Sequence, residues 1–245
     1  LPENRKDLID TKEAIPTGPT VSVSEAGVEA QNRTYQDLLK NKNDEYNFEL
    51  LTQAELHKIN MDGSSSLWKK SDMYRDVSFS PDGNYVMVTT FLEVPLIEDL
   101  PKGFMAERTG KRDVNWRNDK PATLVWTEAL DGGDPENEVP FRDEVFMQDA
   151  PFTGNITSLL KTKDRFRYIQ WGNDNTALAH DYWWNTRNTR TYLFNPSNNK
   201  QEPKIVFDRN YQDVYNNPGN FVSTKNEFDE YVLELDNNNA YLIGD

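Results

Sequence analysis

The chain of 245 residues has no cysteine, no long apolar run and a shortage of basic residues. Without cysteine it cannot form disulfide bonds, use a catalytic thiol, or hold zinc or iron–sulfur groups through cysteine ligands. No run of about 18 apolar residues occurs, so we predict no membrane span. The 41 acidic and 27 basic residues give a net charge of −14. This charge argues against a nucleic-acid partner, because such binding requires Lys and Arg to neutralise phosphates.

Aromatic residues, by contrast, are plentiful, at 12% of the chain. That content is too high for a disordered protein and is enough to build a sizeable core. The first ten residues are charged, contain no apolar segment and lack an initiator Met. We therefore expect no signal peptide in this chain and interpret it as a mature or trimmed product.

The first part of the chain, residues 1–33, shows little periodicity, and proline and glycine interrupt it repeatedly. We predict an extended arm or linker there, with one short strand at 20–24. Apolar residues spaced for a helix predict one or two helical turns over 33–42. From Tyr46 onward the pattern predicts strands and turns.

An internal repeat is the most informative feature of the remainder. Three segments, at 76–88, 113–126 and 168–179, each run from a short strand through an aromatic residue and a polar turn with Asp into an apolar strand. The three aromatic residues are Phe79, Trp116 and Trp171, which are 37 and 55 residues apart. Recurrence at about 40–50 residues is typical of β-propeller blades, which bury their faces by stacking side by side.

Other segments fit the same scheme. A strand at 52–59 leads into a hairpin turn with Asp62-Gly63, and further strands are predicted at 91–94, 143–147, 190–194, 204–207 and 231–235. We therefore predict an all-β fold: a partial β-propeller of roughly three to four four-stranded blades over 34–245, after the arm at 1–33. A β-sandwich is the alternative, although it does not require the repeat.

The residues suited to nucleophilic catalysis do not form a recognisable motif. Ser64 lies in a Gly-Ser-Ser-Ser-Leu string that lacks the last glycine of a nucleophile elbow and falls in a hairpin turn. The only histidines, His57 and His180, lie on predicted strands without a partner motif. We therefore predict no catalytic residue in this chain and leave the substrate-binding residues unassigned.

Acidic residues cluster in one loop and raise the question of calcium. Asp131, Asp134, Glu136 and Glu138 lie close together, but their spacing does not match an EF-hand loop. We interpret the loop as a solvated acidic turn and predict no metal and no cofactor. A carboxylate glycosidase on a propeller is the least supported hypothesis, because no pair of acids stands out among so many.

The stretch 181–190 is unusual because two tryptophans and two arginines lie together. The adjacent residues Trp183 and Trp184 should point to opposite faces of a strand. Arg187 and Arg190 could bind a carboxylate through their planar forks. The favoured interpretation is packing of a tryptophan between blades and ion pairs with nearby acids.

Several strings resemble a known family. They lie at 33–40, 114–124, 131–134, 142–143, 186–191, 207–209, 213–215 and 218–219. Together they resemble the propeller domain of the prolyl oligopeptidase family of serine peptidases, most closely its glutamyl endopeptidase branch. The resemblance extends from about Gly18 to Gly219.

The resemblance implies a propeller that covers a C-terminal α/β-hydrolase domain with a Ser–Asp–His triad and restricts the access of peptides. This chain has no nucleophile elbow, so none of the family's catalytic residues carries over. We expect a non-catalytic propeller segment of a longer peptidase, with the hydrolase domain and peptide substrates as partners. The alternative is a free-standing propeller module that binds a protein or glycan through Trp183 or Trp184.

An incomplete propeller leaves strand edges unpaired. We therefore expect a homodimer through blade edges, a strand swap, or coverage of an edge by residues 1–33. If the longer protein selects glutamate, a local cation must do so, and Arg187 and Arg190 are the candidates. The compartment stays open, with export to the periplasm as the favoured expectation.

Overall fold

The computed structural model describes residues 5–10, 39, 42–91, 95, 100–237 and 239–244. The chain divides into two compact units. The first comprises residues 1–78 and 87–94, and the second comprises residues 79–86 and 95–245. The strand predicted at 20–24, most of the helical turn at 33–42 and the domain boundary after residue 33 lie outside the described residues.

The first unit contains one helix followed by antiparallel hairpins. In order, its elements are α1 (Lys42–Thr52), β1 (Ala54–Ile59), β2 (Ser65–Asp72), β3 (Tyr74–Phe79) and β4 (Val86–Thr90), and β3 and β4 extend into the second unit. The predicted turn between β1 and β2 is confirmed: Gly63 takes φ +83° and donates its N–H to the Asn60 carbonyl at 2.9 Å.

The helix corrects the sequence analysis, which placed strands from Tyr46 onward. Asp44 and Glu45 occupy its first turn, where carboxylates favour the positive end of the helix dipole. Its one buried residue, Leu50, anchors it to the unit. The strand predicted at 91–94 is described only at Phe91, which forms a bend after β4.

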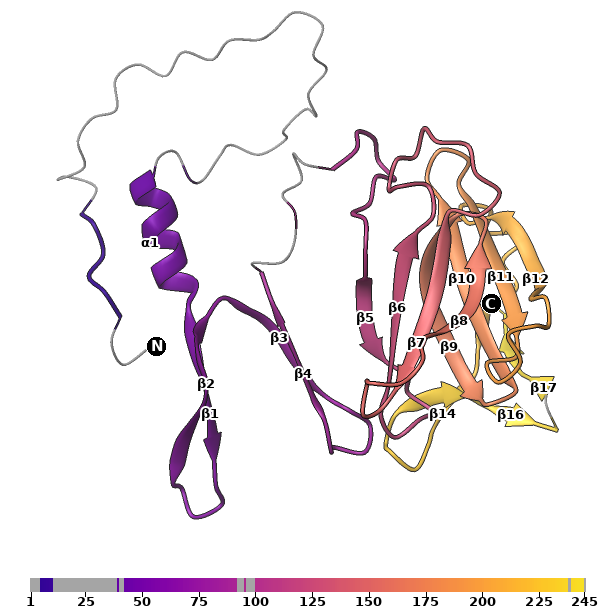
Figure 1. The fold of residues 1–245 in the computed structure, drawn as a ribbon. Coiled ribbons are helices and arrows are strands. Elements are labelled where there is room, and N and C mark those ends of the chain that lie inside the picture. The colour runs from indigo at the N-terminus through magenta and orange to yellow at the C-terminus, as the bar shows by residue number, and fades with distance from the viewer. Residues whose placement is uncertain are drawn as a thin grey trace, which may run out of the picture. The chain divides into compact units, whose positions relative to one another are not determined.

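The second unit is built around two four-stranded antiparallel sheets (Figure 1). The first contains β5 (Arg112–Trp116), β6 (Thr123–Ala129), β7 (Asp143–Asp149) and β8 (Thr157–Thr162). The second contains β9 (Arg165–Asn173), β10 (Thr176–Trp183), β11 (Asn188–Phe194) and β12 (Lys204–Asn210). In both sheets each strand pairs with its neighbour in sequence, which is the topology of a propeller blade.

The remaining strands form two-stranded sheets. They are β13 (Asn220–Phe221), β14 (Ser223–Lys225), β15 (Tyr231–Leu233), β16 (Leu235–Asp236), β17 (Asn239–Ala240) and β18 (Leu242–Ile243). They pair as β13 with β18, β14 with β15, and β16 with β17. The predicted all-β fold and partial propeller are thus confirmed, with two four-stranded blades and shorter pairs of strands among the described residues.

The main core lies between the two four-stranded sheets, as blade stacking requires. Its members come from β6 to β11, and Val145 and Ala177 are fully buried. Trp171 contacts Phe194 edge-on, with ring centroids 6.2 Å apart. Of the repeat aromatics, Trp171 therefore fills the layer between the sheets. Phe79, at the end of the β3–β4 pair, is 65% exposed.

A glycine in the third repeat permits a further close contact. Gly172 lies on β9, against which β15 packs. A Cβ atom at Gly172 would lie 2.8 Å from Leu235 Cδ1. The Trp-Gly pair of the repeat therefore lets the C-terminal strands approach the second sheet.

Candidate functional site

The turns of the internal repeat gather at one end of the second unit, which we call the turn end. They connect β3 to β4, β5 to β6 and β9 to β10, and the β14–β15 turn joins them. The Asp82 N–H donates to the Pro121 carbonyl at 3.0 Å, which joins the first two turns. The Asn226 side-chain amide donates to the Asn118 carbonyl at 2.8 Å, which joins the second to the last.

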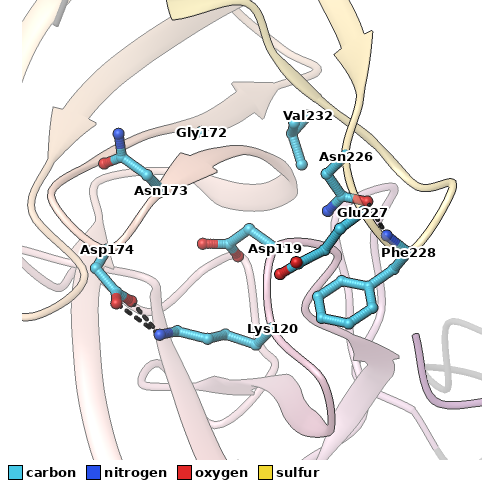
Figure 2. Close-up of a pocket in the computed structure, with 9 residues that line it drawn as sticks. All are labelled: Asp119, Lys120, Gly172, Asn173, Asp174, Asn226, Glu227, Phe228 and Val232. Carbon is cyan, nitrogen blue, oxygen red and sulfur yellow. Dashed lines mark hydrogen bonds and ion pairs between the residues drawn. The ribbon is translucent and has the colours of Figure 1, made fainter. Parts of the chain in front are cut away.

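A small polar pocket of about 200 Å³ opens among these turns (Figure 2). Its lining consists of Asp119, Lys120, Gly172, Asn173, Asp174, Asn226, Glu227, Phe228 and Val232. Lys120 Nζ lies 2.6 Å from the Asp174 carboxylate, and this hydrogen bond lowers the pKa of Asp174. Beneath them, the buried Arg117 donates to Asp119 at 2.7 Å and to Asp174 at 3.2 Å.

Most of the charged side chains in and beneath the pocket form ion pairs with one another. Arg117 holds Asp119 through two nitrogens, and its guanidinium lies 4.6 Å from the Trp171 ring centre. Among the pocket's charged groups, only the exposed Glu227 has no hydrogen-bond or ion-pair partner in the described part of the chain. The pocket therefore serves chiefly to tie adjacent blades together through their repeat turns.

A second polar cluster lies at the opposite end, which we call the loop end. It contains the β6–β7 loop, the β10–β11 turn and the segment that leads into β5. At its centre is Arg165, only 1% exposed, which donates to Asp131 at 2.9 Å and to Asp143 at 3.1 Å. Arg112 also donates to Asp143, and Arg142 donates to Asp131 at 2.8 Å. We call these five residues the buried ion network.

The network changes the interpretation of the acidic loop. Asp131 is 3% exposed and accepts a hydrogen bond from the Gly133 N–H at 2.9 Å, so the prediction of a solvated turn is wrong for this residue. It holds for Glu136 and Glu138, which are exposed. In the part of the chain that the structure describes, no three metal-ligating side chains come together.

The residues considered for nucleophilic catalysis lie apart. Ser64 sits at the tip of the β1–β2 hairpin, where its hydroxyl donates to Asp62 at 2.6 Å. His57 lies 3.2 Å from Glu55, whereas His180 contacts Gln170 at 3.1 Å and Thr191 at 3.2 Å. Burial lowers the pKa of His180 to about 4. Neither histidine contacts a serine among the described residues.

The two arginines of the 181–190 stretch have different environments. Arg190 contacts Asp164, Asp181 at 3.6 Å and Asp208 at 3.1 Å. Burial is the largest single influence and opposes its charge, but the hydrogen bond to Asp164 and the charges of Asp164, Asp181 and Asp208 together outweigh burial and raise the pKa of Arg190. The predicted ion pairs are therefore confirmed for Arg190, whose Nε and Nη1 donate to Asp208 and Asp164.

Arg187 has no such carboxylate. Its guanidinium lies 3.8 Å from the centre of the Trp184 ring, and no carboxylate among the described residues forms an ion pair with it. Trp184 in turn stacks on Phe104, with ring centroids 5.9 Å apart. Trp183 packs instead against Arg142, 4.0 Å from its ring centre.

Sequence reasoning missed Phe104 and the central position of Arg165. Neither belongs to a motif, and their roles depend on contacts between residues distant in sequence. The strings at 131–134 and 142–143 were the local signals near the network.

No helix in the described ranges is long and apolar enough to cross a bilayer. No protein-family profile matches the chain, and no solved structure matches it.

Two curated relatives from plants are similar to the chain over nearly its whole length. "Probable glutamyl endopeptidase, chloroplastic" of Oryza sativa subsp. japonica is 31% identical over 267 aligned positions, which cover 95% of this chain and 28% of the relative. The protein of the same name in Arabidopsis thaliana is 33% identical over 254 positions, covering 91% of this chain and 26% of the relative. The chain thus spans about a quarter of the length of these relatives. The resemblance predicted from the sequence is confirmed: over nearly its whole length the chain is similar to proteins named glutamyl endopeptidases.

Proposed function

We propose that this chain is the non-catalytic propeller segment of a glutamyl endopeptidase-like serine peptidase. In this proposal it restricts the access of peptides to a separate α/β-hydrolase domain, which supplies the catalytic triad. The observation that carries the proposal is the unequal coverage of the alignment. Relatives named as glutamyl endopeptidases match at least 91% of this chain, but the match uses at most 28% of their own length.

The described structure supports this division of roles. Its two complete blades stack through an apolar core, and their ends are joined by ion pairs. Such packing forms a stiff wall rather than a site that rearranges around a reacting substrate. Both histidines are held by side chains other than serine, which is compatible with a triad located elsewhere.

A substrate-size experiment tests the proposal. The longer protein that contains this segment and the hydrolase domain should cleave short peptides with an internal glutamate and leave folded proteins intact. The hydrolase domain expressed alone provides the comparison, and it should cleave large unfolded substrates more readily. Equal rates on short peptides and folded proteins would rule out restricted access. Failure to cleave any glutamyl peptide would rule out the peptidase itself.

A further inference from the structure

An exposed group of aromatic rings and one arginine lies at the loop end. Phe104 is 86% exposed and Trp184 is 42% exposed, although their rings stack on each other. Arg187 lies over the Trp184 ring, 3.8 Å from its centre. We call these three residues the aromatic–arginine patch. Large aromatic side chains that are exposed and adjacent indicate a surface that contacts another molecule.

The backbone of Arg187 is held in an unusual conformation. Its φ is +58°, in the left-handed region that non-glycine residues seldom occupy. Asn185 and Asn188, on either side of it, are of a type that adopts this conformation more readily. Because asparagine would adopt this φ at a lower cost, an arginine at this position indicates a role for its side chain rather than for the turn.

The guanidinium is fixed on one edge and open on the other. Arg187 Nη1 donates to the Trp184 carbonyl at 2.7 Å and lies 3.5 Å from the Tyr211 hydroxyl. In the described part of the chain, Nε and Nη2 have no hydrogen-bond partner. These two nitrogens form the edge of the planar fork that binds a carboxylate through two parallel hydrogen bonds.

The buried ion network supports the patch from beneath. Arg165 Nε donates to the carbonyl of Met105, next to Phe104, at 2.9 Å. Arg142 packs on Trp183, next to Trp184, while it pairs with Asp131. Phe104 and Trp184 are therefore each adjacent in sequence to a residue that the buried ion network contacts. Side chains positioned by such buried contacts lose less freedom when a ligand binds.

The charge of the turn that carries Arg187 favours an anion. The turn from Trp184 to Asn188 contains no acidic residue, although the chain as a whole has a net charge of −14. The acid closest in pairing register, Asp208, is engaged by Arg190 and Asn188. Arg187 thus keeps its positive charge uncompensated by an ion pair among the described residues.

We propose that the aromatic–arginine patch binds a carboxylate group of a peptide. The Nε–Nη2 edge of Arg187 holds the carboxylate, and Phe104 and Trp184 pack against apolar parts of the same peptide. This site lies in the propeller segment itself and goes beyond the proposed restriction of access. It does not depend on the presence of a hydrolase domain.

The test uses the full chain labelled with 15N in its tryptophan indoles. Three acetylated peptides are titrated: Ac-Ala-Glu-Ala-NH2, its isostere Ac-Ala-Gln-Ala-NH2, and Ac-Ala-Ala-Ala with a free C-terminal carboxylate. A Trp184→Phe variant identifies the Trp184 signal. We expect a carboxylate peptide to shift this signal and the glutamine isostere to bind at least about tenfold more weakly, as loss of a charged hydrogen-bond pair predicts.

The Arg187→Gln variant should lose at least about tenfold in affinity for the carboxylate peptide. The matched control, Arg167→Gln, removes an exposed arginine of the neighbouring strand β9 and should bind as the unaltered chain does. Comparison of the glutamate and C-terminal carboxylate peptides identifies the source of the carboxylate. Failure of both carboxylate peptides to bind more tightly than the glutamine peptide, no shift at Trp184, or full affinity in Arg187→Gln would overturn the proposal. None of these outcomes bears on whether the longer protein is a peptidase.

Discussion

At the scale of single residues, Arg165 shows how the blades are held together. It joins the buried carboxylates of Asp131 and Asp143, both of which have fully buried side chains. An Arg165→Leu substitution leaves these acids without their shared partner. We expect the free energy of unfolding to fall by about 3–5 kcal/mol, the usual cost of breaking a buried ion pair. Urea unfolding monitored by tryptophan fluorescence measures the change.

Arg167→Leu is the matched control for this prediction. Arg167 lies on the same strand, β9, but is exposed. Its replacement should change the stability by less than about 0.5 kcal/mol, as is usual for surface positions. Similar losses in the two variants would show that the network contributes no more than a surface charge.

The lowered pKa of His180 predicts that the free energy of unfolding depends on pH. Burial lowers its pKa to about 4 in the folded chain, whereas the pKa of an unperturbed histidine is 6.5. Between these values the unfolded chain binds more protons at this residue than the folded chain does. The His180 contribution is therefore full above pH 6.5 and is lost as the pH falls toward 4, by up to about 3 kcal/mol.

A His180→Gln variant isolates this effect. The difference in unfolding free energy between the variant and the unaltered chain should vary with pH between about 4 and 6.5 and be constant above that range. Urea titrations at several pH values measure the difference. A difference that does not change with pH would contradict the assignment.

At the scale of elements, the β6–β7 loop depends on one glycine. Gly133 takes φ +78°, and a Cβ atom there would lie 1.9 Å from the Glu107 carbonyl oxygen. The neighbouring Gly132 also has a positive φ, +72°, but its Cβ atom would meet nothing within 4 Å. The two positions therefore separate backbone strain from a steric clash.

We expect Gly132→Ala to cost about 1–2 kcal/mol, from left-handed strain alone. Gly133→Ala should cost clearly more, because the Glu107 segment must also move away and lose its 2.9 Å hydrogen bond from the Glu107 N–H to the Gly133 carbonyl. Thermal unfolding of both variants gives the comparison. Equal losses would mean that the loop moves aside without cost.

The elements also show what sequence could predict. Period-two alternation and Asp-Gly turns predicted the β1–β2 hairpin, and the aromatic–turn–strand repeat located β5, β6, β9 and β10. The α1 helix was missed because its apolar face is weak, with Leu50 as its one buried residue. β8 was not expected, because its residues, Thr157–Thr162, do not alternate between apolar and polar side chains.

The same reasoning applies to the candidate sites. The sequence singled out Arg187 and Arg190 together, but only their spatial neighbours distinguish an open guanidinium from one engaged by three carboxylates. Residues such as Arg165 and Phe104 have no local signature. Their roles arise from pairing across blades, which residue spacing alone does not predict.

At the scale of the whole molecule, unpaired strand edges predict self-association. The sheet order places β5 and β8 at the edges of one blade and β9 and β12 at the edges of the next. Exposed edges readily pair with other strands. We expect the isolated chain to form a dimer as its concentration rises, observed as an increasing mass in sedimentation velocity. A monomer at all concentrations, with solution scattering that shows both ends of the propeller segment uncovered, would contradict this expectation.

We propose that this chain forms a propeller segment without a catalytic serine of its own. Treatment of the pure chain with a fluorophosphonate probe, followed by intact-mass analysis, tests this proposal. We predict no covalent adduct, whereas the proposed longer protein should gain one adduct per chain at the serine of its proposed hydrolase domain. A stoichiometric adduct on a serine of the isolated chain, absent after unfolding, would contradict the account.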